Sequence, residues 1–135
     1  GRVQRERILR AVARAELVVN YALESLAYLP TRVFPARSQI VIVSPLLSGD
    51  VPVLARIRAY GYAVMVISPD PVTYSATYYK DSSSAAYRLA YAERAVMLRQ
   101  LRKNGIQIVN WAIGQSLELA IREELAHQQQ IGRMQ

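Results

Sequence analysis

Short polar side chains follow two apolar segments of the chain and could form a small ligand site. The segments are 39–44 and 62–68, and the polar residues at or after their ends are Ser44, Ser48, Asp50, Ser68 and Asp70. Ligands of open parallel sheets bind outside the carboxyl ends of the strands, so these hydroxyls and carboxylates could face a common pocket. The two carboxylates could also share a hard divalent cation such as Mg²⁺.

The same residue types also have a purely structural use in loops. Asp50 precedes a segment with a helical pattern, and its carboxylate could accept hydrogen bonds from the first N–H groups of that helix. Asp70 lies between two prolines, where an aspartate commonly shapes a turn. We favour this structural interpretation and predict no bound metal or cofactor, while ligand binding by the five residues stays open as an alternative.

The chain lacks the residues on which most catalytic motifs depend. It contains no cysteine, and its single histidine, His127, is expected to be solvated near the end of the last helix. Neither a P-loop nor a GxGxxG motif is present, so no phosphate-binding loop is predicted. We therefore predict no catalytic residue and no enzymatic activity.

Five of the nine tyrosines lie within residues 74–91. The set that we consider as an interaction surface is Tyr74, Tyr78, Tyr79, Tyr87 and Tyr91. Tyrosine is enriched at the cores of protein interfaces, and its ring can also stack on nucleobases. Alternatively, the rings pack over an edge of the sheet and expose only their hydroxyl groups.

The formal net charge of +7 raises the possibility of a polyanionic partner. However, no nucleic-acid recognition motif accompanies the arginines. Acidic residues alternate with them in the helical segments: Glu6, Glu16, Glu24, Glu93 and Glu118. Solvated, ion-paired helix faces are the favoured interpretation, so nucleic-acid binding is kept only as an alternative.

The elements that must position these residues follow from apolar patterns. Three β-branched runs, at 39–44, 62–68 and 106–111, predict strands that are buried on both faces. Apolar spacing of three and four residues predicts helices around them. These helices span 3–28, 51–60, 84–103 and a last segment that Ser116 caps and that ends near His127.

Several details complete this expectation. Gly61 is placed to end the second helix in the left-handed conformation. Residues 69–84 are expected to be a polar loop, and the glutamine-rich tail 128–135 to be frayed. In the helix at 84–103, the residues predicted to face the core are Leu89, Val96, Met97 and Leu101.

Strands that alternate with helices predict right-handed parallel crossovers. We therefore expect residues 1–135 to form one α/β domain, a three-layer Rossmann-like half-domain with three parallel strands and a long N-terminal helix. Because the chain begins with Gly1, we expect it to be part of a longer protein. So small a sheet has two edges made of apolar strands, and a second copy, an upstream half of the protein or the long first helix must cover one of them. We favour the pairing of two copies as a homodimer.

Three motifs of the chain resemble a known family. They are Ser-Pro-Leu after the first strand, Asp-Pro after the second, and the helical Tyr-Arg-Leu-Ala…Glu-Arg…Leu-Arg that precedes Gly105. Over roughly residues 8–125, their order resembles the C-terminal von Willebrand factor A-like domain of DUF58 proteins. The similarity covers only the C-terminal half of that domain.

The resemblance implies the last three strands of a Rossmann-like sheet and a parent protein with membrane helices upstream. It also implies a soluble domain on the cytoplasmic side and a MoxR-type ATPase as a partner. The metal motif Asp-x-Ser-x-Ser of such domains is absent here, and Ser44-Pro45 stands where another metal ligand is usual. Together with the residues above, the resemblance predicts a non-catalytic interaction or assembly module.

Overall fold

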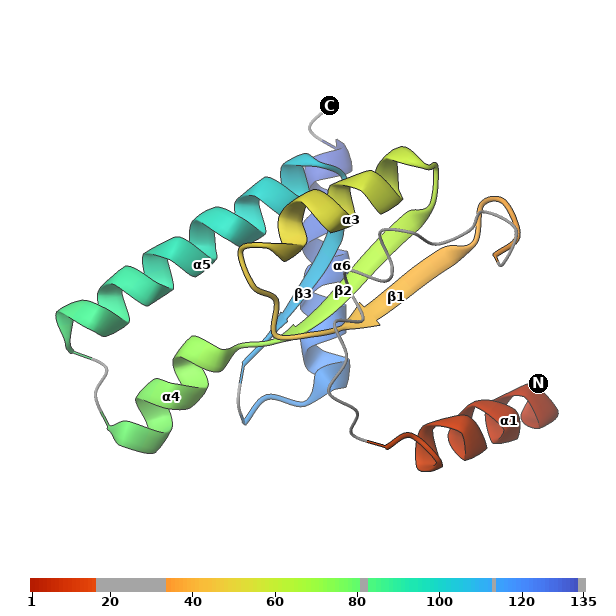
Figure 1. Cartoon of the computed structure of the whole chain (residues 1–135), viewed down its shortest axis with the longest axis horizontal. Coiled ribbons are helices and arrows are strands. Elements are labelled where there is room, and N and C mark those ends of the chain that lie inside the picture. Colours follow the sequence, from red (N-terminus) through yellow and green to blue (C-terminus); the bar gives the residue numbers. More distant parts are fainter. Residues whose placement is uncertain (17–33, 81–82, 113, 134–135) are drawn as a thin grey trace.

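Three strands form one parallel sheet at the centre of the chain (Figure 1). The computed structural model describes residues 1–16, 34–80, 83–112 and 114–133. The strands β1 (Gln39–Val43), β2 (Ala63–Pro69) and β3 (Gln107–Trp111) are arranged in the order β1-β2-β3. The predicted α/β fold with three parallel strands is confirmed.

Helices cover the two faces of this sheet unequally. The crossovers from β1 to β2 and from β2 to β3 contain α3 (Asp50–Ala59), α4 (Pro71–Tyr79) and α5 (Ala85–Lys103), and α3 and α5 pack together over the sheet. The last helix, α6 (Leu117–Arg133), packs on β3, on the opposite face (Figure 1). The result is the expected three-layer arrangement, in which α6 contacts only one of the three strands.

Local capping explains several helix boundaries. The hydroxyl oxygens of Ser84 and Ser116 accept hydrogen bonds from backbone N–H groups in the first turns of α5 and α6, and Gly61 has a φ of +90° after α3. The cap at Ser116 and the helix end at Gly61 confirm two predictions, whereas the cap at Ser84 was not predicted. The predicted N-cap role of Asp50 is wrong, because Gly49 occupies the N-cap position. The carboxylate of Asp50 instead accepts the N–H of Leu47 at 2.7 Å and so closes the loop before α3.

The helix α4 lies in a segment that was expected to be a polar loop. Pro71 occupies its first position, where proline has a suitable φ and no intrahelical N–H to lose. The side chain of Asp70 accepts the N–H groups of Val72 and Thr73 and so caps the helix. Lys80, in the left-handed region at φ 52°, ends it.

The two terminal helices also differ in length from the predictions. The structure places α1 at Arg2–Ala13, with all of its residues exposed, and it contacts no other described helix or strand. Residues 17–28 of the predicted first helix lie outside the described residues. At the other end, α6 continues to Arg133, beyond the predicted end near His127 and into the segment that was expected to be frayed.

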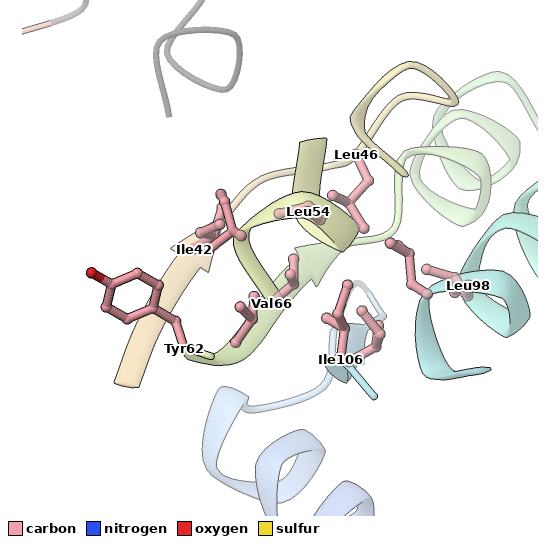
Figure 2. Close-up of a cluster of buried hydrophobic side chains, with 11 residues drawn as sticks. Ile42, Leu46, Leu54, Tyr62, Val66, Leu98 and Ile106 are labelled. Carbon is pink, nitrogen blue, oxygen red and sulfur yellow. The ribbon is translucent and has the colours of Figure 1, made fainter. Parts of the chain in front are cut away.

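The main core fills the space between the sheet and the α3–α5 layer. Figure 2 shows its buried side chains, which include Ile42, Leu54, Val66 and Ile106. The buried stripe of α5 consists of Arg94, Leu98 and Leu101, which are separated by four and three residues and share one helix face.

The core face predicted for α5 is only partly correct. Leu101 is fully buried and Met97 packs at the margin of the core, as predicted. Leu89 and Val96 are 61% and 52% exposed. They fall outside the helix face that Arg94, Leu98 and Leu101 turn toward the sheet.

The second face of the sheet becomes progressively more exposed from β3 to β1. Val109 on β3 is buried on the side of α6, and its neighbours Met65 and Ile67 on β2 are half-buried. On β1, Val41 and Val43 are 53% and 68% exposed. The expectation that every strand is buried on both faces is therefore wrong for β1, because α6 contacts β3 and does not contact β1.

Alanine substitutions at two leucines of α5 test which face of this helix packs in the core. Leu101→Ala should lower the free energy of unfolding by about 2–5 kcal/mol, because it leaves a cavity in a packed interior. Leu89→Ala should change it by no more than about 0.5 kcal/mol, because the side chain is exposed. Urea denaturation followed by circular dichroism measures both, and equal losses in the two variants would contradict the assignment.

Candidate functional site

A buried arginine joins the carboxyl ends of all three strands. Arg94 of α5 donates from Nη1 to the carbonyl oxygen of Pro45, 2.9 Å away in the loop after β1. Its Nη2 donates to Ser68 Oγ on β2 at 2.9 Å and to Asn110 Oδ1 on β3 at 2.7 Å. The hydroxyl of Ser68 in turn donates to the carbonyl oxygen of Pro45 at 3.2 Å. We call these residues, together with Asp70, the Arg94 cluster.

Asp70 neutralises the charge of this arginine. Its Oδ1 lies 3.2 Å from Arg94 Nε, and the side chains of Arg94 and Asp70 are 6% and 4% exposed. The contact is an ion pair by distance, although Nε makes no aligned hydrogen bond. Burial lowers the pKa of Arg94, while the charge of Asp70 opposes this shift. An arginine nevertheless stays protonated in proteins, so the cluster holds a permanent cation.

Asp70 also connects the cluster to the backbone around it. Its Oδ1 accepts the N–H of Val72 at 2.9 Å at the start of α4. Its own N–H donates to the carbonyl oxygen of Trp111 at the end of β3. One aspartate therefore caps a helix, pairs with a buried cation and joins the ends of β2 and β3.

The structure brings together only two of the five predicted ligand residues. Ser68 and Asp70 belong to the Arg94 cluster. The hydroxyl of Ser44 accepts the N–H of Leu46, Ser48 is exposed, and Asp50 bonds within its own loop. Within the described ranges, no group of three or more histidine, cysteine, aspartate or glutamate side chains could hold a metal ion. The side chain of His127 lies outside the part that the structure describes.

The prediction missed the two residues that complete the cluster, Arg94 and Asn110. The clue for Arg94 was its spacing, because it precedes Leu98 and Leu101 by four and seven residues on the apolar stripe of α5. A cation within such a stripe requires buried acceptors. Asn110 stands at the carboxyl end of the third predicted strand, the same kind of position from which the other ligand residues were predicted.

Two pockets flank the cluster. The first, which we call the arginine pocket, has a volume of about 320 Å³ and is lined by Asp70, Tyr91, Arg94, Arg99, Arg102 and Asn110, with apolar side chains between them. The second has a volume of about 450 Å³ and is mainly apolar. Its wall includes Pro45, Pro69, Pro71, Tyr74 and Trp111. The side chains of Arg94 and Asp70 are buried, so a ligand beside the cluster would occupy one of these two pockets.

The tyrosines are more exposed than expected if their rings packed over an edge of the sheet. Tyr74, Tyr78 and Tyr79 lie on α4 and are 56%, 71% and 74% exposed. Tyr78 stacks on Tyr74 and meets Tyr79 edge to face. We call these three residues the tyrosine surface. Tyr87 and Tyr91 form a separate pair on α5, with ring centroids 6.1 Å apart.

The two edges of the sheet also differ. At the outer edge of β3, Arg102 donates to the carbonyl oxygen of Ile108, and Trp111 donates its indole N–H to the carbonyl oxygen of Gln115. On β1, the N–H of Ser44 donates to the carbonyl oxygen of Ile67 on β2. The backbone N–H and C=O groups of residues 40, 42 and 44 therefore point toward β2, because alternate residues of a strand point to the same side. The N–H and C=O groups of Val41 and Val43 therefore point away from the sheet. No described residue bonds to them.

Comparisons of the chain with protein-family models, curated proteins and solved structures find no match. Among the helices of the described ranges, none is both long and apolar enough to cross a membrane. The fold and the geometry of the site therefore carry the functional argument.

Removal of Arg94 tests the role of the cluster. Arg94→Leu should lower the free energy of unfolding by about 3–5 kcal/mol, because Asp70 would remain buried without its cation. Adding Asp70→Asn to this variant should recover part of the loss, because the unpaired charge is then gone. Thermal and urea unfolding measure both effects.

The matched control is Arg88→Leu, an exposed position on the same helix. It should change the free energy of unfolding by no more than about 0.5 kcal/mol. Equal effects at Arg88 and Arg94 would show that the loss comes from a change in net charge or helix propensity and would contradict the role of the cluster.

Proposed function

We propose that this protein is a non-catalytic assembly module that pairs with a second copy of itself through the open edge of β1. The observation that carries the proposal is the contrast between the two edges of the sheet. On β3, Arg102 donates to one outward carbonyl group, that of Ile108, whereas the outward backbone groups of Val41 and Val43 on β1 have no described partner and both valine side chains are exposed. Natural proteins commonly protect such edges, because an open edge strand accepts another strand.

Antiparallel pairing of two β1 strands would satisfy these outward groups. If Val41 faces Val41 of the second copy, Gln39 faces Val43, and each of these residue pairs exchanges two hydrogen bonds. The exposed valine side chains of both copies would then lie together on one face of a six-stranded sheet. A two-fold contact of this kind is self-complementary and closes without forming a fibre.

The charge distribution supports a second copy as the partner. The whole chain has a formal net charge of +7, but residues 38–49 contain no charged side chain. Two copies can therefore approach along β1 without like charges facing each other across the strands. β1 also lacks the lysine or proline with which edge strands often prevent such pairing.

The tyrosine surface supports a role in protein interaction independently of β1. Three exposed rings in mutual contact, one of which lines an apolar pocket, are typical of interface residues. This surface could bind a different protein, such as the MoxR-type ATPase that the family resemblance implies. The tyrosine surface is thus a second contact surface, and substitutions in it should not affect pairing through β1.

Sedimentation equilibrium over a range of protein concentrations tests the proposal. The wild-type chain should approach twice its monomer mass as the concentration rises. Val43→Lys should weaken the dimer at least about tenfold, because it places a cation on each side of the paired edge. The side chain is exposed, so the fold of the monomer should not change.

Two control variants make the result specific. Val96→Lys introduces the same charge at an exposed valine of α5 and should leave the dimer unchanged. Replacing Tyr78 and Tyr79 with alanine should also leave it unchanged. A wild-type chain that stays monomeric at all concentrations would overturn the proposal, and so would a dimer that the tyrosine variant dissociates and Val43→Lys does not.

A further inference from the structure

The arginine pocket contains an excess of hydrogen-bond donors. Arg94, Arg99 and Arg102 from α5 line it together with Asn110 from β3, and Asp70 is the single carboxylate on its wall. Its volume of about 320 Å³ lies at the lower end of the range for small-molecule sites. A pocket with this lining is complementary to a ligand that accepts hydrogen bonds and carries negative charge.

The single carboxylate does not cancel the positive charge of the pocket. Asp70 is paired with Arg94 and accepts two N–H groups at the start of α4. Arg102 lies 3.3 Å from Glu124 and also binds a backbone carbonyl group. Arg99 has no ion-pair or hydrogen-bond partner within the described residues. Its charge is therefore available to a ligand.

Asn110 adds an oriented donor. Its side-chain atom that faces Arg94, at 2.7 Å, must be the oxygen, because a guanidinium group has no acceptor. The amide nitrogen of Asn110 consequently carries two hydrogens that Arg94 does not use. Because the Arg94 contact fixes the orientation of the amide, this donor is held at the wall of the pocket before any ligand arrives.

We propose that the arginine pocket binds a small oxyanion, the phosphate or carboxylate group of a soluble ligand, through Arg99, Arg102 and the amide nitrogen of Asn110. The site lies between α5 and the carboxyl end of β3, and of the five predicted ligand residues only Asp70 lines it. Arg94 acts as a positioning residue, because its Nη1 and Nη2 already donate to protein acceptors and its Nε faces Asp70. The proposal is independent of pairing through β1.

A titration with inorganic phosphate, followed by two-dimensional ¹H–¹⁵N NMR at constant ionic strength, tests this site. Saturable shifts are expected at the side chains of Arg99 and Asn110, with a dissociation constant of about 1 mM or lower. Arg99→Gln should weaken binding about tenfold, because a charge-assisted hydrogen bond is lost. Arg88→Gln removes the same charge from an exposed position of α5 outside the pocket and should leave the affinity unchanged.

Asn110→Asp provides a second variant that should still fold. The aspartate keeps an oxygen for Arg94 but replaces the free donor with a negatively charged acceptor, so phosphate binding should be lost while thermal unfolding stays close to wild type. A parallel titration with acetate shows whether a carboxylate also binds. The proposal is overturned if neither anion gives saturable shifts, if sodium chloride reproduces the shifts, or if Arg88→Gln weakens binding as much as Arg99→Gln.

Discussion

The guanidinium group of Arg94 holds the carboxyl ends of the three strands together, and the rest of the site depends on it. Burying a cation is costly unless acceptors surround it. Here Asp70, Ser68, Asn110 and the carbonyl group of Pro45 supply those acceptors. The arrangement fixes α5 over the sheet, orients the amide of Asn110 and separates the two pockets. The position at which open parallel sheets usually bind ligands is therefore occupied by the protein's own side chain.

This constraint moves the candidate interaction surfaces to the periphery of the domain. With only three strands, β1 and β3 each have one edge that pairs with no other strand, and the contacts at these two edges differ. Arg102 from α5 covers a carbonyl group of β3, and α6 packs on that strand. Neither element contacts β1, and among the described residues nothing bonds to its outward backbone groups, while the side chains of Val41 and Val43 are exposed.

The sequence was sufficient to predict the elements that local chemistry determines. The β-branched runs indicated the three strands, and Ser116 and Gly61 marked helix ends through a short-range hydrogen bond and backbone conformation. The Arg94 cluster could not be predicted in this way, because its acceptors lie 16 to 49 residues from Arg94 along the chain. The exposure of β1 could not be predicted from the sequence either, because a strand that is covered on one face and a strand that is covered on both faces can have the same β-branched composition.

A single engineered cysteine tests the assembly most directly, because the chain has none of its own. In the proposed pair, Val41 faces its copy across the two-fold axis with the Cα atoms about 5.5 Å apart, which is within disulfide reach. Val41→Cys should therefore form a cross-linked dimer under mild oxidation, at concentrations where Leu89→Cys, on an exposed face of α5, stays monomeric. A Val41→Cys chain that cross-links no faster than Leu89→Cys would contradict pairing through β1.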